Sequence, residues 1–132
     1  MLAATSPAVR LLAVNVNYPS SYSALAASAI LSHYGHPNIP VGICRPLTDV
    51  TFFDSWYFEL GEFASKLAYH WRSENGTVAV RWGHVDEDAW DPVKLYRKVL
   101  AEAEDGSVTI ASIGFFVNVR SHSLTLLSLS TH

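Results

Sequence analysis

The stretch RLLAVNVNYPSSYSALAASAILSHYG, residues 10–35, decides the fold class of this chain of 132 residues. Its first part, residues 10–17, is a short apolar run with β-branched valines, which is typical of a buried strand. Pro19 ends the run because proline has no N–H to donate to a ladder, and the serines that follow are suited to cap a helix. Residues 21–34 are small and apolar at helical spacing, and Gly35 stands where such a helix is expected to stop. The stretch therefore predicts a strand followed by a helix that packs closely on a sheet.

The remaining sequence continues to alternate between strand-like and helix-like segments. A second strand is expected at residues 40–44, a helix at residues 55–71, and a third strand at residues 107–113 (SVTIASI). Between them, Asp91 followed by proline predicts a helix to Glu104. The expected apolar face of that helix consists of Val93, Tyr96, Leu100 and Ala103. This order favours an α/β fold with a partial open, mostly parallel sheet flanked by helices.

Length, charge and composition restrict the class of protein. The length suits a single domain, and 49% apolar residues exclude a disordered chain. Nine Lys and Arg against twelve Asp and Glu, with no basic stripe, predict that neither nucleic acid nor an anionic membrane is a partner. No apolar run reaches the ~20 residues that cross a bilayer, and no basic residue precedes the first apolar run as in a signal peptide. A cytoplasmic location is the default expectation.

Three polar segments are candidates for a functional site. Residues 15–17 (NVN) stand at the carboxyl end of the first expected strand, where open α/β sheets bind ligands, and an asparagine suits sugar hydroxyls. Alternatively, Asn17 only caps the next helix or forms the turn into it, and the sequence favours neither interpretation over the other. Residues 113–118 (IGFFVN) follow the third expected strand, and their carbonyls could bind a hard cation or form an ordinary turn. His84, Asp86 and Asp88 alternate in a polar segment that could hold a metal ion, although a solvated acidic loop is favoured.

The other reactive side chains are assigned structural roles. Cys44 is the single cysteine and lies in an apolar run, which predicts a buried thiol rather than a nucleophile. His33, His36 and His70 are expected to lie at the surface or in packing contacts. No recurrent phosphate-binding or nucleophile motif occurs in the sequence.

Several segments taken together resemble a known family. They are residues 15–22 (NVNYPSSY), 34–42 (YGHPNIPVG), 45–47 (RPL), 96–101 (YRKVLA) and 106–118 (GSVTIASIGFFVN). In order and spacing they look like the second strand and following helix, the next strand, and the helix and strand that end in a GPLTN-type segment of the inosine–uridine preferring nucleoside hydrolases, notably their fungal members. The resemblance covers about residues 11–118.

The resemblance implies a calcium-dependent N-ribohydrolase that splits purine or pyrimidine nucleosides into base and ribose, often as a homo-oligomer. In such enzymes an Asp-rich segment of the form DxDxxxDD holds calcium and the ribose diol. The metal-bound water is acidified and attacks the anomeric carbon through an oxocarbenium-like state. By position, Asn17 matches an asparagine that lines the nucleoside pocket. Val117 matches the residue whose backbone carbonyl coordinates calcium.

The sequence departs from the family pattern at the metal site. Its first aspartate is Asp49, so the Asp-rich segment has no counterpart, and neither do the family's later sugar contacts. We expect a partial hydrolase domain over residues 1–118, truncated at both ends, and a non-family tail over residues 119–132. We expect this chain not to bind calcium and to be inactive by itself. A non-catalytic α/β binding or interaction module, and a small metal hydrolase built on the polar segment described above, are the alternatives.

Overall fold

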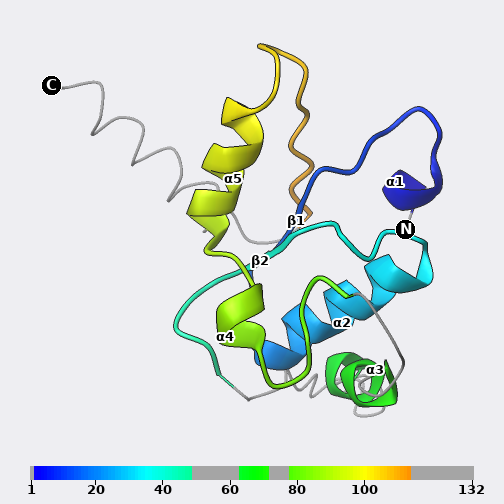
Figure 1. Cartoon of the computed structure of the whole chain (residues 1–132), viewed down its shortest axis with the longest axis vertical. Helices are drawn as coiled ribbons and strands as arrows, with labels where there is room; N and C mark the ends of the chain where they lie inside the picture. Colours follow the sequence, from blue (N-terminus) through cyan, green and yellow to red (C-terminus); the bar gives the residue numbers. More distant parts are fainter. Residues whose placement is uncertain (1, 49–62, 72–77, 114–132) are drawn as a thin grey trace, which may run out of the picture.

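The computed structural model describes residues 2–48, 63–71 and 78–113. These residues form two strands, β1 (Val14–Val16) and β2 (Val41–Ile43), and the five helices α1 (Leu2–Thr5), α2 (Ser21–His33), α3 (Phe63–Trp71), α4 (Val85–Asp88) and α5 (Pro92–Ala101). The strands pair in parallel as an open sheet (Figure 1), so the predicted mixed α/β architecture is confirmed for this part of the chain. None of the helices described is long and apolar enough to cross a membrane.

Helix α2 forms where the sequence predicts it. It begins after Ser20, whose backbone is extended, and the chain leaves it through Gly35, whose φ of 82° favours glycine. The Ser20 side chain is fully buried but makes no capping hydrogen bond, so the expected serine cap is present in position only. Instead, the Ser21 N–H donates to the carbonyl of Thr48 at 2.9 Å. The start of α2 is therefore held by the segment that follows β2.

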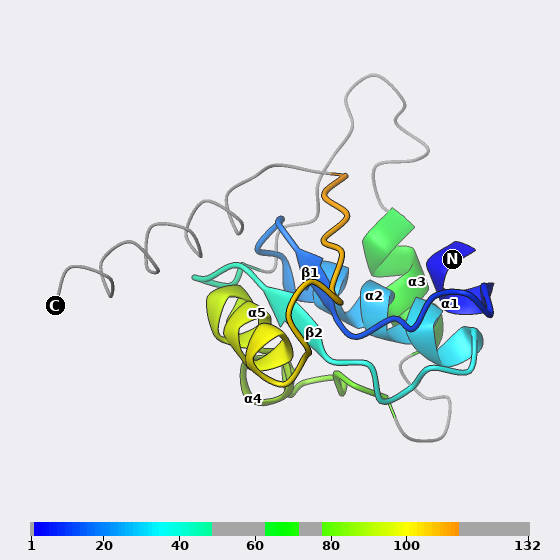
Figure 2. The same cartoon turned by 90° about the horizontal axis from the view of Figure 1, so that it is seen from above.

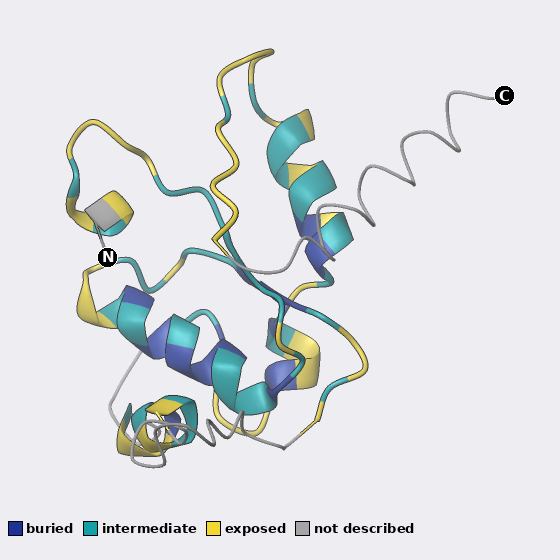
Figure 3. Cartoon of the chain, turned by 180° about the vertical axis from the view of Figure 1, so that it is seen from behind, coloured by how far each residue is buried: buried dark blue, intermediate teal, exposed yellow. Residues whose placement is uncertain are grey.

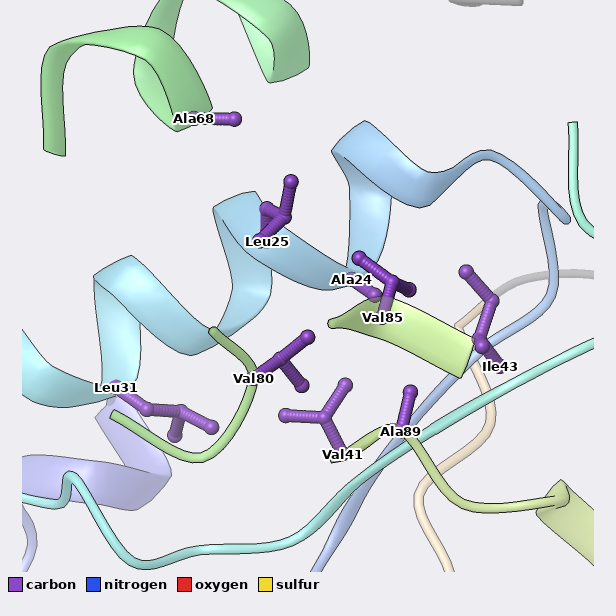
Figure 4. Close-up of a cluster of buried hydrophobic side chains, with 9 residues drawn as sticks. All are labelled: Ala24, Leu25, Leu31, Val41, Ile43, Ala68, Val80, Val85 and Ala89. Atoms are coloured by element: carbon purple, nitrogen blue, oxygen red, sulfur yellow. The ribbon is translucent and has the colours of Figure 1, made fainter. Parts of the chain in front are cut away.

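One face of the sheet is apolar and is covered by α2. Val14 pairs with Val41 and Val16 pairs with Ile43, and the two β2 residues are 0% exposed. Figure 4 shows the buried cluster that these β2 side chains share with the helices. Its members are Ala24, Leu25, Leu31, Val41, Ile43, Ala68, Val80, Val85 and Ala89. Inside it, the Val80 N–H donates to the Ser28 hydroxyl at 2.9 Å, which joins the segment after residue 78 to α2.

The other face of the sheet carries the intervening residues and is covered by α5. Asn15 pairs with Gly42, and a Cβ atom added at Gly42 would overlap the Asn15 amide oxygen and lie 3.1 Å from Leu95 Cδ2. Leu95 belongs to α5 and is 0% exposed. Because alternate residues of a strand point to opposite faces, α2 and α5 lie on opposite sides of the sheet. Figures 1 and 2 show this three-layer order, with α3 beyond α2.

The start of α5 is confirmed, but its buried face differs from the prediction. The Asp91 carboxylate accepts from the N–H groups of Val93 and Lys94 at 3.0 and 2.9 Å, as a helix cap should. Leu95 and Pro92 are the buried residues of the helix. The predicted face (Val93, Tyr96, Leu100 and Ala103) is only half-buried. The reason is tertiary: the side chain that meets the gap above Gly42 is Leu95.

The predicted third strand is not present. Residues 107–113 have no strand pairing and are exposed along most of their length (Figure 3). The neighbour of β2 on its outer side is Trp90, whose N–H donates to the Val41 carbonyl at 2.9 Å and whose carbonyl accepts from the Ile43 N–H at 3.0 Å. A single residue thus occupies the place of a strand, which no periodic pattern in the sequence signals.

The remaining predictions are corrected, confirmed in part or left untested. The polar segment of His84, Asp86 and Asp88, for which the sequence favours a solvated loop, contains the short helix α4. The predicted helix over residues 55–71 is described from Phe63 onward, where it is present as α3, with Ala68 buried and Phe63 exposed. The predicted domain end at residue 118 and the tail at 119–132 lie outside the described residues.

Candidate functional site

The first candidate residue, Asn17, lies at the carboxyl edge of the sheet as predicted. It directly follows β1 and is half-buried. Beyond the strands the two chain segments continue side by side, because Ser20 and Thr48 form a parallel bridge and the Thr48 N–H donates to the Pro19 carbonyl at 2.7 Å. Asn17 is therefore held between the end of β1 and the start of α2, at the edge where parallel sheets bind ligands.

Arg45, just after β2, carries a positive charge to the same edge. Its Nη1 pairs with the Asp86 carboxylate, and its Nη2 donates to the carbonyls of Asp86 and Ala89 at 3.1 and 2.9 Å. These bonds tie the segment after β2 to α4. Because the guanidinium of Arg45 already binds Asp86 and Ala89, we do not assign it a role in binding an anionic substrate.

The candidate metal ligands on and before α4 are each engaged by a different partner. The Asp88 carboxylate accepts from Arg81 Nε and Nη2, both at 2.8 Å, and His84 Nδ1 contacts the Glu87 carboxylate at 3.0 Å. Asp86, as stated above, pairs with an arginine on the sheet edge. Across residues 2–48, 63–71 and 78–113, no three His, Cys, Asp or Glu side chains gather as a metal site would require. The metal interpretation of His84, Asp86 and Asp88 is therefore not supported.

The Asp88–Arg81 pair makes stability depend on pH. Hydrogen bonding by Arg81 to the ionised carboxylate is the main reason that the pKa of Asp88 lies below its ordinary value of 3.8. Because the pKa is lowered in the folded state, the stabilisation is complete above the ordinary value and is lost as the pH falls through the lowered one. We expect Asp88→Asn to lower the urea midpoint at neutral pH, by an amount that shrinks in acid. Glu104→Gln, at an exposed carboxyl outside the pair, is the control; equal acid sensitivity of the wild type and Asp88→Asn would contradict the assignment.

The calcium site implied by the resemblance does not fit the described residues. Calcium is held by six to eight oxygen ligands, several of them carboxylates. At the carboxyl edge of the sheet the side-chain oxygen of Asn17 has no carboxylate cluster beside it among the described residues, and the carboxylates of α4 pair with arginines. Val117, the predicted carbonyl ligand, and Asp49 both lie outside the described residues.

A cluster of aromatic rings near the start of α2 was not predicted. Tyr22 of α2, Tyr69 of α3 and Trp82 have ring centroids 4.9–6.3 Å apart, and the two tyrosine hydroxyls are 3.2 Å apart. The three residues come from distant parts of the sequence, so no local pattern could have joined them. The rings contact one another and hold α3 and the segment around Trp82 against α2.

The single thiol and the histidines have the structural roles expected of them, with one adjustment. Cys44 is half-buried rather than fully buried. His33 and His70 pack edge-on against Trp71, and His36 Nε2 lies 2.6 Å from the carbonyl oxygen of Ala4 in α1.

The described geometry is thus an asparagine at the carboxyl edge of a two-stranded parallel sheet, together with two ion pairs, Arg45–Asp86 and Arg81–Asp88, whose partners satisfy each other. It identifies a position suited to a polar ligand without supplying a metal centre. No protein-family model, curated protein or solved structure matches this chain in the comparisons made.

Proposed function

We propose that this chain is a nucleoside-hydrolase-type α/β domain that contacts the ribose of a nucleoside through Asn17 and does not cleave the nucleoside by itself. The position of Asn17 at the carboxyl edge of β1 and β2 is the observation that carries the proposal. A primary amide can donate to one hydroxyl of a ribose diol and accept from the other. The resemblance of residues 11–118 to nucleoside hydrolases supplies the substrate class.

We expect no turnover because the part of the chain that the structure describes lacks a cluster of carboxylate ligands that would hold a calcium ion. A calcium ion of the kind that the family uses lowers the pKa of its bound water, and water without a metal keeps its much higher pKa. The first aspartate of the sequence is Asp49, and the carboxylates described in α4 are paired with Arg45 and Arg81. We therefore expect inosine and uridine to stay intact with this chain, whether or not calcium is added.

Binding of inosine and uridine, measured by titration with NMR detection, tests the role of Asn17. We expect weak binding that Asn17→Ala reduces by about tenfold, the loss of roughly one hydrogen-bonding group, ~1.4 kcal/mol. Asn38→Ala, which removes the same amide from an exposed loop, should leave the binding unchanged. Equal binding by the wild type and Asn17→Ala would refute the ribose contact. Release of ribose that EDTA abolishes would refute the absence of turnover.

A non-catalytic interaction module is the second candidate, and the exposure of residues 107–113 favours it. Ile110 is 44% exposed and Ile113 is fully exposed, although both are large apolar residues in a β-prone segment. Such a segment is suited to pairing with another chain. A cooperative melt without aggregation would support this function over a partial hydrolase domain.

A further inference from the structure

The sheet has one open edge within the described residues. In a parallel ladder, alternate residues of a strand bond to the same neighbour. Val14 donates to the Pro40 carbonyl at 3.1 Å, and Val16 accepts from the Cys44 N–H at 3.3 Å, so both use their backbone groups on β2. The N–H and carbonyl of Asn15 between them point to the other side. The outer side of β2 is already bonded to Trp90, which leaves β1 as the open edge among the residues described.

Residues 107–113 are the complementary element. They include β-branched Val108, Thr109 and Ile110, and they follow the turn at Gly106, whose φ is 74°. They form no bridge to β1 of their own chain. The side chain of Ile113 is fully exposed. This segment therefore has the composition of a strand and no partner strand among the described residues.

Neither element carries the features by which proteins keep strand edges apart. Natural sheets protect their edges with charged residues, prolines or a covering element. Residues 11–16 (LLAVNV) and residues 107–113 (SVTIASI) contain no charged residue and no proline. Neither charge repulsion nor a proline without an N–H would therefore hinder pairing between these two segments.

We propose that the open edge of β1 binds residues 107–113 of a second copy of this chain, and that the exchange is reciprocal. A twofold dimer of this kind satisfies both unpaired elements at once, because each copy supplies one edge and one strand. The added strand bonds to the outward backbone groups of Asn15, and its own Ile110 and Ile113, which are exposed in the monomer, become covered by the other copy. Two short strand exchanges make a small interface, so the dimer depends on protein concentration.

Light scattering after gel filtration of the full chain, over a range of concentrations, tests the stoichiometry. The expected result is a mass that rises from the monomer's 14.5 kDa to twice that value. Hydrogen exchange on the same samples locates the interface. The amides at Asn15 and in residues 107–113 should exchange more slowly in the dimer than in the monomer, by about tenfold. Protection of residues 107–113 in a monomer would overturn the proposal in favour of pairing within one chain.

Substitutions distinguish strand pairing from nonspecific association of the exposed apolar residues. Because neighbouring N–H groups of a strand point to opposite sides, the double variant Thr109→Pro/Ile110→Pro removes a ladder N–H whichever side faces β1, and Ile110→Lys puts a charge on the docked strand. Both positions are exposed, so neither variant disturbs the buried core. Each should shift the dissociation constant by about tenfold or more toward monomer. Ala101→Lys, which adds the same charge at an exposed position in α5, is the matched control. A dimer unchanged by Thr109→Pro/Ile110→Pro, or a monomer at all concentrations, would overturn the proposal.

Discussion

Replacing Gly42 with valine is expected to destabilise the protein by about 3 kcal/mol, at the upper end of the usual range for overpacking. A Cβ atom at this position would overlap the Asn15 amide oxygen, lie 3.0 Å from Asn15 Cγ and lie 3.1 Å from Leu95 Cδ2. The Asn15 oxygen is buried and has no hydrogen-bond partner in the described structure, so the side chain fills the space without being anchored there. The penalty is therefore steric, and it depends on Asn15.

A double-mutant cycle in urea unfolding isolates this dependence. Asn15→Ala alone should be close to neutral, because it removes an unpaired buried oxygen together with its packing contacts. In the Asn15→Ala background, Gly42→Ala should lose much of the penalty that it has in the wild type, giving a coupling energy of about 0.5–3 kcal/mol. If Gly42→Ala has the same effect in both backgrounds, the obstruction is Leu95 and not Asn15.

Truncation of Leu95 to alanine is expected to lower the free energy of unfolding by about 2–5 kcal/mol, as for other fully buried leucines. Leu95 is 0% exposed and is the α5 side chain that closes the Asn15–Gly42 face of the sheet. Its loss would leave a cavity between that face and the helix. Chemical unfolding with two probes, far-UV circular dichroism and tryptophan fluorescence, measures the change and checks that the transition stays two-state.

Leu100→Ala is the matched control, because it makes the same truncation on the half-buried side of α5. The structure predicts a smaller loss of stability for Leu100→Ala than for Leu95→Ala. The reverse order would mean that the helix docks on the face predicted from the sequence, with Leu100 inward.

The parts of the fold that could be predicted are those with local causes. Asp91 and Pro92 mark the start of α5 because capping and a preset φ act within one turn. Gly35 marks the end of α2 for the same kind of reason. The two short strands were recognised from apolar runs with β-branched residues. β2 is buried, as parallel strands usually are, whereas β1, which contains Asn15, is only half-buried.

The parts that could not be predicted depend on contacts between distant segments. Which side of α5 is buried depends on the gap above Gly42, and helical periodicity alone pointed to another face. The pairing of Arg45 with α4 joins segments whose separate sequences show only ordinary charges. For the site, the position of Asn17 at the sheet edge followed from strand polarity. The separate ion pairs of Asp86 and Asp88, which argue against a metal, depend on arginines that the spacing of the acidic residues does not reveal.

The bond between β2 and Trp90 has a consequence for the order in which the protein is made. During synthesis β1, α2 and β2 leave the ribosome before Trp90, which closes the outer side of β2. At ~5–20 residues per second the nascent chain exposes that side of β2 for several seconds. The same interval separates the synthesis of Arg45 from that of Asp86 and Ala89, which hold its side chain. The N-terminal half of the domain is thus a nascent species with an exposed edge, and it is there that we expect chaperones to act.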